Sequence, residues 1–267
     1  MTEPISSAAN PLVKRVRLLA DRKIRRREGA FVVEGVQPVW RAVEAGWQIE
    51  VLLVCPDLLA GSPALAMVEA QRGRGVRVVE LTSELFGRIS DRDGPSGLAA
   101  VVRSRPLDLT TLDLPADAVV VALHEVANPG NLGTIVRTAD AAGAAAVVLI
   151  GPTADPYAPA AVKASMGSLF GIRLARVDDA AAFFAWAEAH RVQVVATSGY
   201  AEQAHWDAGY RPPVAVLLGS EGDGLPGDVL DRADLRVRIP MTGTAESLNL
   251  AVAAGVMIYE LRRHALA

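Results

Sequence analysis

This 267-residue sequence contains one cysteine, few aromatic residues and no long apolar run. The single cysteine, Cys55, excludes a disulfide within the chain and cannot complete a zinc site, so we assign no metal and expect a reducing, cytoplasmic setting. Because Cys55 ends the apolar run at 51–55, we interpret it as a small buried residue. No apolar run reaches the roughly 18 residues of a membrane span, and the polar start lacks a signal-peptide core. A membrane partner is therefore not expected.

Aromatic residues make up only 5% of the chain, although 51% of its residues are hydrophobic. The core must therefore be built mainly from Ala, Val and Leu, a composition typical of α/β proteins whose parallel strands are covered on both faces. The length suits one large domain or two of ordinary size.

An overall excess of positive charge is also missing, since 27 Lys and Arg face 30 Asp and Glu and the net charge is −3. This balance argues against a protein that coats nucleic acid through its overall field. The cations are nevertheless concentrated near the N-terminus, in a pattern that fits either a patch for RNA phosphates or a solvated helix face. The candidate RNA-binding residues are Lys14, Arg15, Arg22, Lys23, Arg25, Arg26 and Arg27.

Helical and strand periodicities alternate along the chain, which predicts an α/β fold with mixed or parallel sheets. In the first half we expect helices at 11–19, 36–45, 63–71 and 83–90, and strands at 31–33, 51–55, 76–81 and 98–102. In the second half we expect strands at 118–123, 145–150, 192–197, 214–218 and 235–239, and helices at 132–142, 160–168, 180–190 and 248–264. The pattern dissolves between these halves, so we predict domains at 1–105 and 117–267 joined by a linker at 106–116.

The stretch at 128–143 is the first candidate site, because it links two apolar strands through a turn and a helix. Asn128, Pro129 and Gly130 favour a sharp turn. The apolar face of the helix that follows is formed by Leu132, Ile135, Val136 and Ala139. Asn131 and Arg137 lie off this face, at the end of a strand where open α/β sheets bind ligands. A solvated Arg and an N-capping Asn are the alternative interpretation.

The second candidate site is the glycine-rich loop at 217–227, directly after a strand. Its glycines let the backbone approach a ligand closely, and Glu221 offers a carboxylate. Residues 222–227 also match the dinucleotide fingerprint G-x-G-x-x-G, which would indicate a nucleotide-dependent oxidoreductase. We discount that match, because the fingerprint opens a long helix and here only a short run follows.

The third candidate site lies at 239–250, where a strand ends, a loop turns, and Ser247 and Asn249 enter the last helix. Ser247 as an N-cap and Glu246 as a partner of the helix dipole are simpler interpretations. All three stretches, however, follow strands of one predicted sheet. If the strands are parallel, their polar residues converge at one edge, which is the strongest physical sign of a site.

Taken together, these stretches resemble the three motifs of the SpoU/TrmH branch of the SPOUT superfamily, the RNA ribose 2′-O-methyltransferases. The first is carried by Asn131 to Gly143, the second by Gly219 to Leu225, and the third by Ile239 to Met241 with Glu246 to Leu250. The front half resembles the family's substrate-binding domain at Asn10–Pro11, at Arg25 and at residues 31–35. The resemblance covers nearly the whole chain.

The resemblance implies an L30e-like N-terminal domain, a C-terminal domain with a deep trefoil knot, S-adenosylmethionine as cofactor, and a homodimer. The sequence is consistent with a dimer, because the last helix has an apolar face formed by Leu248, Val252, Gly255, Val256 and Tyr259, although a face buried in the core would show the same pattern. The implied catalytic residues are Arg137, Asn131, Glu221, Ser247 and Asn249. The implied cofactor-binding residues are Leu218, Gly219, Ser220, Glu221, Gly222, Ile239, Met241, Ser247 and Leu248. We expect 23S ribosomal RNA as substrate, with transfer RNA or a non-catalytic RNA-binding role as alternatives.

Overall fold

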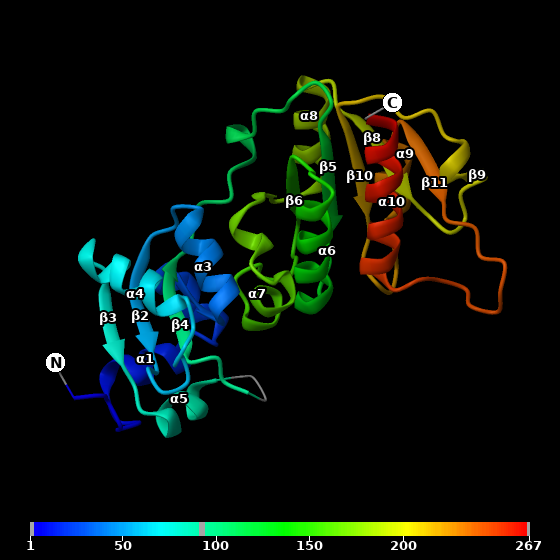
Figure 1. The fold of residues 1–267 in the computed structure, drawn as a ribbon. Coiled ribbons are helices and arrows are strands. Elements are labelled where there is room, and N and C mark those ends of the chain that lie inside the picture. The colour runs from blue at the N-terminus through cyan, green and yellow to red at the C-terminus, as the bar shows by residue number, and fades with distance from the viewer. Residues whose placement is uncertain (1–2, 91–93, 266–267) are drawn as a thin grey trace. The chain divides into compact units, whose positions relative to one another are not determined.

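The computed structural model describes residues 3–90 and 94–265, which form two compact units (Figure 1). One unit comprises Met1–Arg105 with Tyr157–Gly171, and the other comprises Pro106–Pro156 with Ile172–Ala267. In the part of the chain that the structure describes, no helix combines the length and the apolar character needed to cross a bilayer.

The first unit is built on a mixed four-stranded sheet with the order β1-β4-β2-β3. Strand β4 (Leu98–Arg103) runs antiparallel to β1 (Ala30–Glu34) and β2 (Ile49–Val54), and β2 runs parallel to β3 (Arg77–Glu80). The helices before and between these strands are α1 (Pro11–Leu18), α2 (Arg22–Glu28), α3 (Val36–Glu44), α4 (Ala64–Gly73) and α5 (Ser83–Ile89). The mixed sheet agrees with the alternation in the sequence, whereas helix α2 was not expected there.

The segment Tyr157–Gly171 packs with the first unit, although the sequence placed it in the second domain. It contains helix α7 (Pro159–Ser165) and the 3₁₀ turn η2 (Ser168–Phe170). An aromatic cluster holds it: the ring of Tyr157 stacks on Phe31 at 4.6 Å, and Trp47 donates its indole N–H to the carbonyl oxygen of Phe170 at 3.2 Å. These contacts join residues far apart in the chain, so local periodicity could not have predicted them.

The second unit is a seven-stranded, fully parallel sheet with the order β7-β6-β5-β10-β8-β11-β9. Its strands are β5 (Val119–His124), β6 (Ala146–Ile150), β7 (Arg173–Val177), β8 (Gln193–Thr197), β9 (Gln203–Ala204), β10 (Val214–Leu218) and β11 (Leu235–Arg238). Its helices are α6 (Pro129–Ala141), α8 (Ala180–Ala189), α9 (Gly227–Asp231) and α10 (Leu250–Ala265), with 3₁₀ turns η1 (Leu109–Thr111) and η3 (His205–Asp207). Strand β7 was missed because Arg173 and Arg176 interrupt its apolar pattern.

Helices cover both faces of this sheet. Helix α10 packs on α6, β5 and β10, whereas Phe183 and Trp186 of α8 and Val229 of α9 join a core cluster on the other face. Leu109 and Leu112 belong to that second cluster and are only 5% and 4% exposed. The segment expected to be a linker is therefore packed against the sheet. Its leucines bury apolar area there, and the polar residues around them hide this pattern in the sequence.

Candidate active site

The carboxyl ends of β5 and β10 form the edge at which the three candidate stretches meet. The two strands are neighbours in register, from Val214 beside Val119 to Leu218 beside Leu123. From β5 the chain moves outward to β6 and β7, then returns to the other side of β10 to form β8. Such a reversal in strand order is the place where open α/β sheets leave a crevice for ligands.

Helix α6 begins at this edge because Asn128 and Pro129 form a strong start signal. The Asn128 side chain accepts hydrogen bonds from the backbone N–H groups of Gly130 and Asn131, at 2.8 and 3.1 Å, and Pro129 occupies the first turn. This satisfies N–H groups that would otherwise lack partners at a helix start. The capping residue is thus Asn128, which the sequence assigned to the turn. The Asn131 side chain is not needed as the cap and can therefore make other contacts.

The face of α6 that packs on the sheet is the one expected, since Leu132, Ile135, Val136 and Ala139 are all at most 1% exposed. Arg137 projects from the opposite side and is exposed. No described residue forms a hydrogen bond or ion pair with its guanidinium. A permanent cation that is not engaged by the protein is available to a ligand.

The loop after β10 is closed tightly on itself. Ser220 and Gly224 exchange two backbone hydrogen bonds of 3.2 and 3.3 Å, and Leu225 is buried beneath them. A Cβ atom on Gly219 would lie only 2.2 Å from the backbone carbon and oxygen of Gly224. Position 219 therefore requires glycine. At Gly222, in contrast, a Cβ would meet no atom within 4 Å, so the outer side of the loop is open.

A hydrogen-bonded chain of three side chains joins the three stretches. The Asn131 amide donates to Glu221 Oε1 at 3.0 Å, and the Asn249 amide donates to Asn131 Oδ1 at 3.2 Å. Asn249 also caps α10, accepting from the N–H groups of Ala251 at 2.9 Å and Val252 at 3.4 Å. The sequence assigned Ser247 as the possible cap and began the helix at residue 248; both were wrong, because the side chain with the capping geometry is Asn249.

The remaining predicted cofactor residues lie in the loop between β11 and α10, which Figure 1 shows in orange as an extended segment. Ile239 is half-buried, and residues 241–249 are exposed. Met241 and Leu248 are each 37% exposed, so two apolar side chains lie at the surface there. Among the described residues, no hydrogen bond links the Ser247 side chain to the loop after β10. The structure thus brings Asn131, Glu221 and Asn249 together, but not Ser247.

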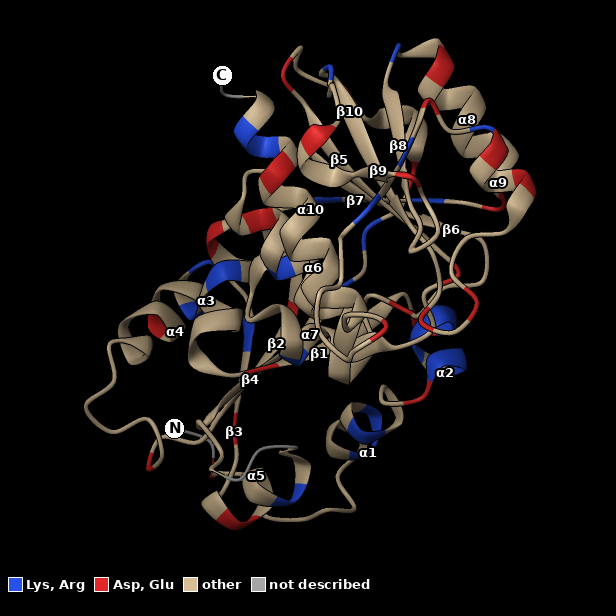
Figure 2. Cartoon of the chain, turned by 90° about the vertical axis from the view of Figure 1, so that its right-hand side faces the viewer, with Lys and Arg blue, Asp and Glu red and all other residues tan. Residues whose placement is uncertain are grey.

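The predicted RNA-binding residues lie on α1 and α2 of the first unit, where Figure 2 shows their blue segments. Five of them are exposed: Lys14, Arg22, Lys23, Arg26 and Arg27. Arg15 is half-buried and pairs with Glu28 and Glu50 at 2.7 Å each; the hydrogen bond with Glu28 raises the pKa of Arg15.

Arg25 is a correction to the predicted RNA-binding set. It is only 6% exposed, and its guanidinium donates to the carbonyl oxygens of Leu19 at 2.9 Å and Ala20 at 2.6 Å. These carbonyls lie just beyond α1, where a helix lacks donors for its last oxygen atoms. Arg25 therefore joins α2 to the end of α1 and is not available at the surface.

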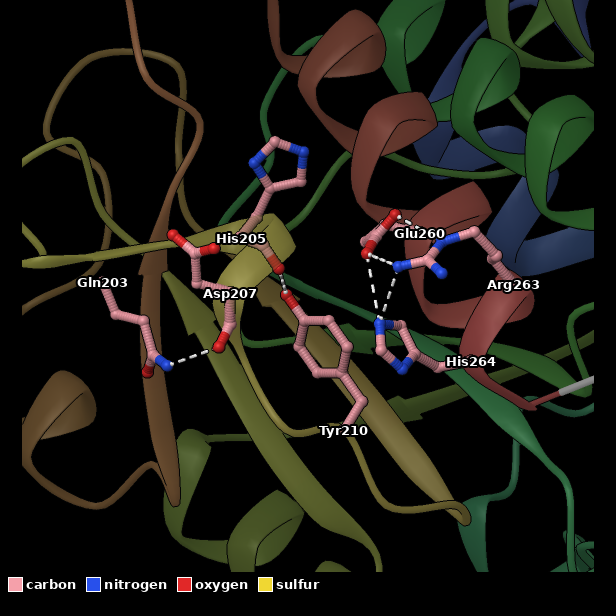
Figure 3. A network of polar contacts seen from close by, with 7 residues as sticks. All are labelled: Gln203, His205, Asp207, Tyr210, Glu260, Arg263 and His264. Atoms are coloured by element: carbon pink, nitrogen blue, oxygen red, sulfur yellow. Dashed lines mark hydrogen bonds and ion pairs between the residues drawn. The ribbon is translucent and has the colours of Figure 1, made fainter. Parts of the chain in front are cut away.

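A polar network that the sequence did not predict holds the far end of α10 (Figure 3). The Tyr210 hydroxyl donates to the carbonyl oxygen of His205, the rings of Tyr210 and His264 lie 5.0 Å apart, and Arg263 donates to Glu260 at 2.7 Å. Burial, and secondarily the Glu260 charge, raises the pKa of Tyr210 to about 12. Glu260 and His264 lie 11 and 15 residues beyond Asn249 along α10, so the network is about 16–22 Å away from it and is a structural anchor.

The glycine-rich match at 222–227 is not a dinucleotide site. Helix α9, which follows it, has only five residues, Gly227–Asp231. The fingerprint places a pyrophosphate at the start of a long helix, and this helix is too short to provide one. The short helix therefore agrees with the expectation from the sequence that residues 222–227 are not a dinucleotide fingerprint.

Comparison with known proteins agrees with this geometry. Residues 118–259 match the SpoU rRNA methylase family, and residues 10–100 match the MRM3-like substrate binding domain. The chain is 34% identical over 254 residues to a 23S rRNA (uridine(2479)-2′-O)-methyltransferase of Streptomyces viridochromogenes, covering 92% of this chain and 87% of that protein. It is also 30% identical over 258 residues to the Bacillus subtilis 23S rRNA (guanosine(2553)-2′-O)-methyltransferase RlmP, covering 97% and 98%.

Among solved structures, an AdoMet-bound rRNA methyltransferase from Sinorhizobium meliloti superposes with a TM-score of 0.90 at 38% identity, covering 98% of both chains. The sequence similarity thus extends over both compact units, and the fold agrees along nearly the whole length. With three motifs joined at one sheet edge and a family match over the second unit, the chain belongs to the SpoU rRNA methylase family.

Proposed function

We propose that this protein transfers a methyl group from S-adenosylmethionine to a ribose 2′-hydroxyl of 23S ribosomal RNA. The observation that carries the proposal is the side-chain connection Glu221–Asn131–Asn249, which joins three segments distant in sequence at one sheet edge. The names of the relatives support the substrate, because two of them act on 23S rRNA.

The residues at this edge fit the cofactor. The loop after β10 is rigid at its base and open over Gly222, and the nearby loop exposes the apolar side chains of Met241 and Leu248. An adenosine that carries a sulfonium-bearing chain needs both exposed backbone polar groups and apolar cover. We propose that the cofactor contacts Leu218, Gly219, Ser220, Glu221, Gly222, Ile239, Met241, Ser247 and Leu248. When bound, it supplies an electrophilic methyl group on a good leaving centre.

The residues of this chain must then align the ribose oxygen and manage its proton. Transfer forms an oxygen–carbon bond, breaks the sulfur–carbon bond and releases the hydroxyl proton to solvent water, which reaches this exposed edge. Arg137 is not suited to be the base, because a guanidinium is not deprotonated in proteins. We propose instead that Arg137 holds a substrate phosphate and stabilises the developing negative charge on the oxygen.

Asn131 is proposed to position the ribose, since its orientation is set from both sides. Its amide N–H donates to Glu221 and its amide oxygen accepts from Asn249, so the two ends cannot be exchanged without losing both bonds. Glu221 and Asn249 are therefore proposed to orient Asn131. Ser247 is proposed to shape the cofactor loop.

We also propose that the protein is a homodimer that uses the outer face of α10. Val252, Val256 and Tyr259 recur at helical spacing on α10 and are 53%, 36% and 55% exposed, and Leu248, just before the helix, is 37% exposed. A stripe of this kind on one helix matches the core of a protein interface. Sedimentation of the wild type and of Val252→Glu tests it: the wild type is expected to be a dimer, and the charged variant a monomer.

The finer features of the fold also belong to this proposal. We propose that the second unit, the methyltransferase domain, contains a trefoil knot; in support, β10 inserts between β5 and β8, and α10 returns from β11 to pack on α6 and β5. We propose that the first unit is an L30e-like RNA substrate-binding domain. A cytoplasmic location follows from the proposed substrate, and the free, buried Cys55 is compatible with it.

The exposed cations of α1 and α2 are proposed to contact RNA phosphates. Replacing Lys14, Lys23 and Arg26 together with Gln is expected to weaken RNA binding and to reduce the slope of log affinity against log salt by about 0.7–0.9 for each phosphate that is no longer neutralised. Arg72→Gln is the matched control, because Arg72 is 44% exposed but already paired with Glu80 at 3.1 Å. An unchanged slope in the triple variant would show that these helices are only a solvated face.

The proposed function is tested by incubating the protein with tritiated S-adenosylmethionine and unmodified bulk RNA, then separating ribosomal from transfer RNA. Label at ribose in the 23S fraction is the expected result. Label in transfer RNA would retain the chemistry but overturn the substrate. Cofactor binding without label in either fraction would overturn the proposed activity.

A further inference from the structure

Tyr200 is the most exposed aromatic side chain in the described structure, at 99% of its accessible surface. The next aromatic residues, Tyr259 and Trp206, are 55% and 54% exposed. In a chain with only 5% aromatic residues, most rings are placed in the core. A fully exposed ring is therefore an exception among the aromatic residues of this protein.

The loop that carries Tyr200 leaves the sheet beside the proposed cofactor loop. Strands β8 and β10 are adjacent and parallel, with Ala196 beside Leu217, and the Thr197 hydroxyl donates to the carbonyl oxygen of Leu217 at 3.3 Å. Neighbouring strands are about 4.8 Å apart. The segment after Thr197 and the segment after Leu218 therefore emerge at the same edge of the sheet.

Hydrogen bonds hold this loop in place. Ser198 N–H donates to the carbonyl oxygen of Val237 at 3.0 Å, and Tyr200 N–H donates to the Ser198 hydroxyl at 3.3 Å. On the C-terminal side of Tyr200, Ala201 is only 8% exposed, and its carbonyl oxygen accepts a hydrogen bond from Arg238 Nη1 at 3.1 Å. The backbone on both sides of Tyr200 is anchored, so the ring is presented to solvent on a supported loop.

We infer that Tyr200 is a stacking platform for an unpaired nucleobase of the RNA substrate next to the methylated ribose. An aromatic face stacks on any base, and proteins that recognise RNA sequence target unstacked bases in loops and ends in this way. Arg238 brings a cation to the same loop, where it suits the phosphate of the stacked nucleotide. Glu202, exposed two residues further along the chain, disfavours a phosphate near it, so the neutral ring is the main contact.

This inference rests on the proposed function, and its test measures binding separately from turnover. The probe is unmodified 23S ribosomal RNA, titrated against the wild type, Tyr200→Ala, Tyr200→Leu, Tyr200→Phe and Tyr200→Trp. Loss of the ring in the Ala and Leu variants is expected to weaken binding about tenfold. The Phe and Trp variants are expected to bind like the wild type, because stacking needs the ring and not the hydroxyl. Glu202→Gln, in the same loop, is the control for general effects of altering the loop; because it removes only a negative charge, it is expected to bind RNA at least as tightly as the wild type.

With tritiated cofactor, Tyr200→Ala is expected to raise the KM for RNA about tenfold while kcat and cofactor binding stay near wild type. Wild-type affinity in the Ala variant would overturn the inference and leave the proposed function intact. A Phe variant as weak as Ala would replace stacking by a hydrogen bond of the hydroxyl and overturn it as well. If the wild type is a dimer and Tyr200→Ala is a monomer, the ring belongs to a protein interface, and the inference is overturned as well. Failure of the wild type to methylate RNA would instead refute the proposed function.

Discussion

Asn249 has two separable roles, one in the stability of α10 and one in the orientation of Asn131. Its side-chain oxygen caps two N–H groups of the helix, and its amide N–H donates to Asn131. Replacing it with Ala removes both. We expect the loss of the cap to cost about 1 kcal/mol and the loss of the solvent-exposed hydrogen bond about 0.5 kcal/mol. The sum, about 1.5 kcal/mol, corresponds to a fall in Tm of roughly 3–6 °C.

Asn249→Asp separates the two roles. The carboxylate still accepts from the N–H groups of the helix and is favoured by the helix dipole, so we expect a Tm close to that of the wild type. It cannot donate to Asn131, which then faces carboxylates at both Glu221 and position 249. We expect kcat to fall on the order of tenfold to a hundredfold, as is usual when a positioning group is displaced.

Thermal unfolding followed by circular dichroism, together with the tritium assay at saturating RNA, measures both effects. An Asp variant that melts as low as the Ala variant would show that the cap is not the source of the stability. An Asp variant as fast as the wild type would show that the bond to Asn131 has no part in the reaction. Either result would refute the corresponding half of the reasoning.

Three further predictions follow from the same structure. Arg137→Ala is expected to lower kcat at least a hundredfold while the cofactor Kd, measured by calorimetry, stays near wild type, because the guanidinium is proposed to act on the RNA. Gly219→Ala is expected to abolish cofactor binding in the same calorimetric assay, since its Cβ would lie 2.2 Å from the Gly224 backbone. In Tyr210→Phe, the free energy of unfolding, measured with urea, is expected to fall less between pH 10 and pH 12 than in the wild type. The raised pKa of Tyr210, about 12, means that the unfolded chain ionises first, so the native state loses stability as the pH rises from 10 towards 12.

Each of these predictions has an outcome that would contradict it. Cofactor binding lost in Arg137→Ala would place the guanidinium in the cofactor site. Normal binding in Gly219→Ala would mean that the loop opens at little cost. An equally steep alkaline loss of stability in Tyr210→Phe would assign that loss to other groups.

The sequence predicted the candidate site better than it predicted which distant segments pack together. The apolar face of α6, the glycine-rich loop and the polar residues after the strands were visible because periodicity and turn residues are local properties. The capping residues were less well predicted. Asn128, which was assigned to a turn, caps α6, and Asn249 caps α10 in place of Ser247. Several polar residues near a helix start can cap it, and only the backbone geometry selects one.

What the sequence by itself determined is the alternation of strands and helices and the chemical character of the segments that follow the strands, whereas the fully parallel arrangement of the second sheet came from the structure. The tertiary structure alone decided that Arg25 is buried, that the segment Tyr157–Gly171 packs with the first unit, and that Asn131 and Asn249 are in contact although 118 residues apart. These facts depend on which distant segments bury their apolar surfaces against each other and on which backbone carbonyl groups need a hydrogen-bond donor. Such conditions exist only once the chain is folded, so no local pattern carries them.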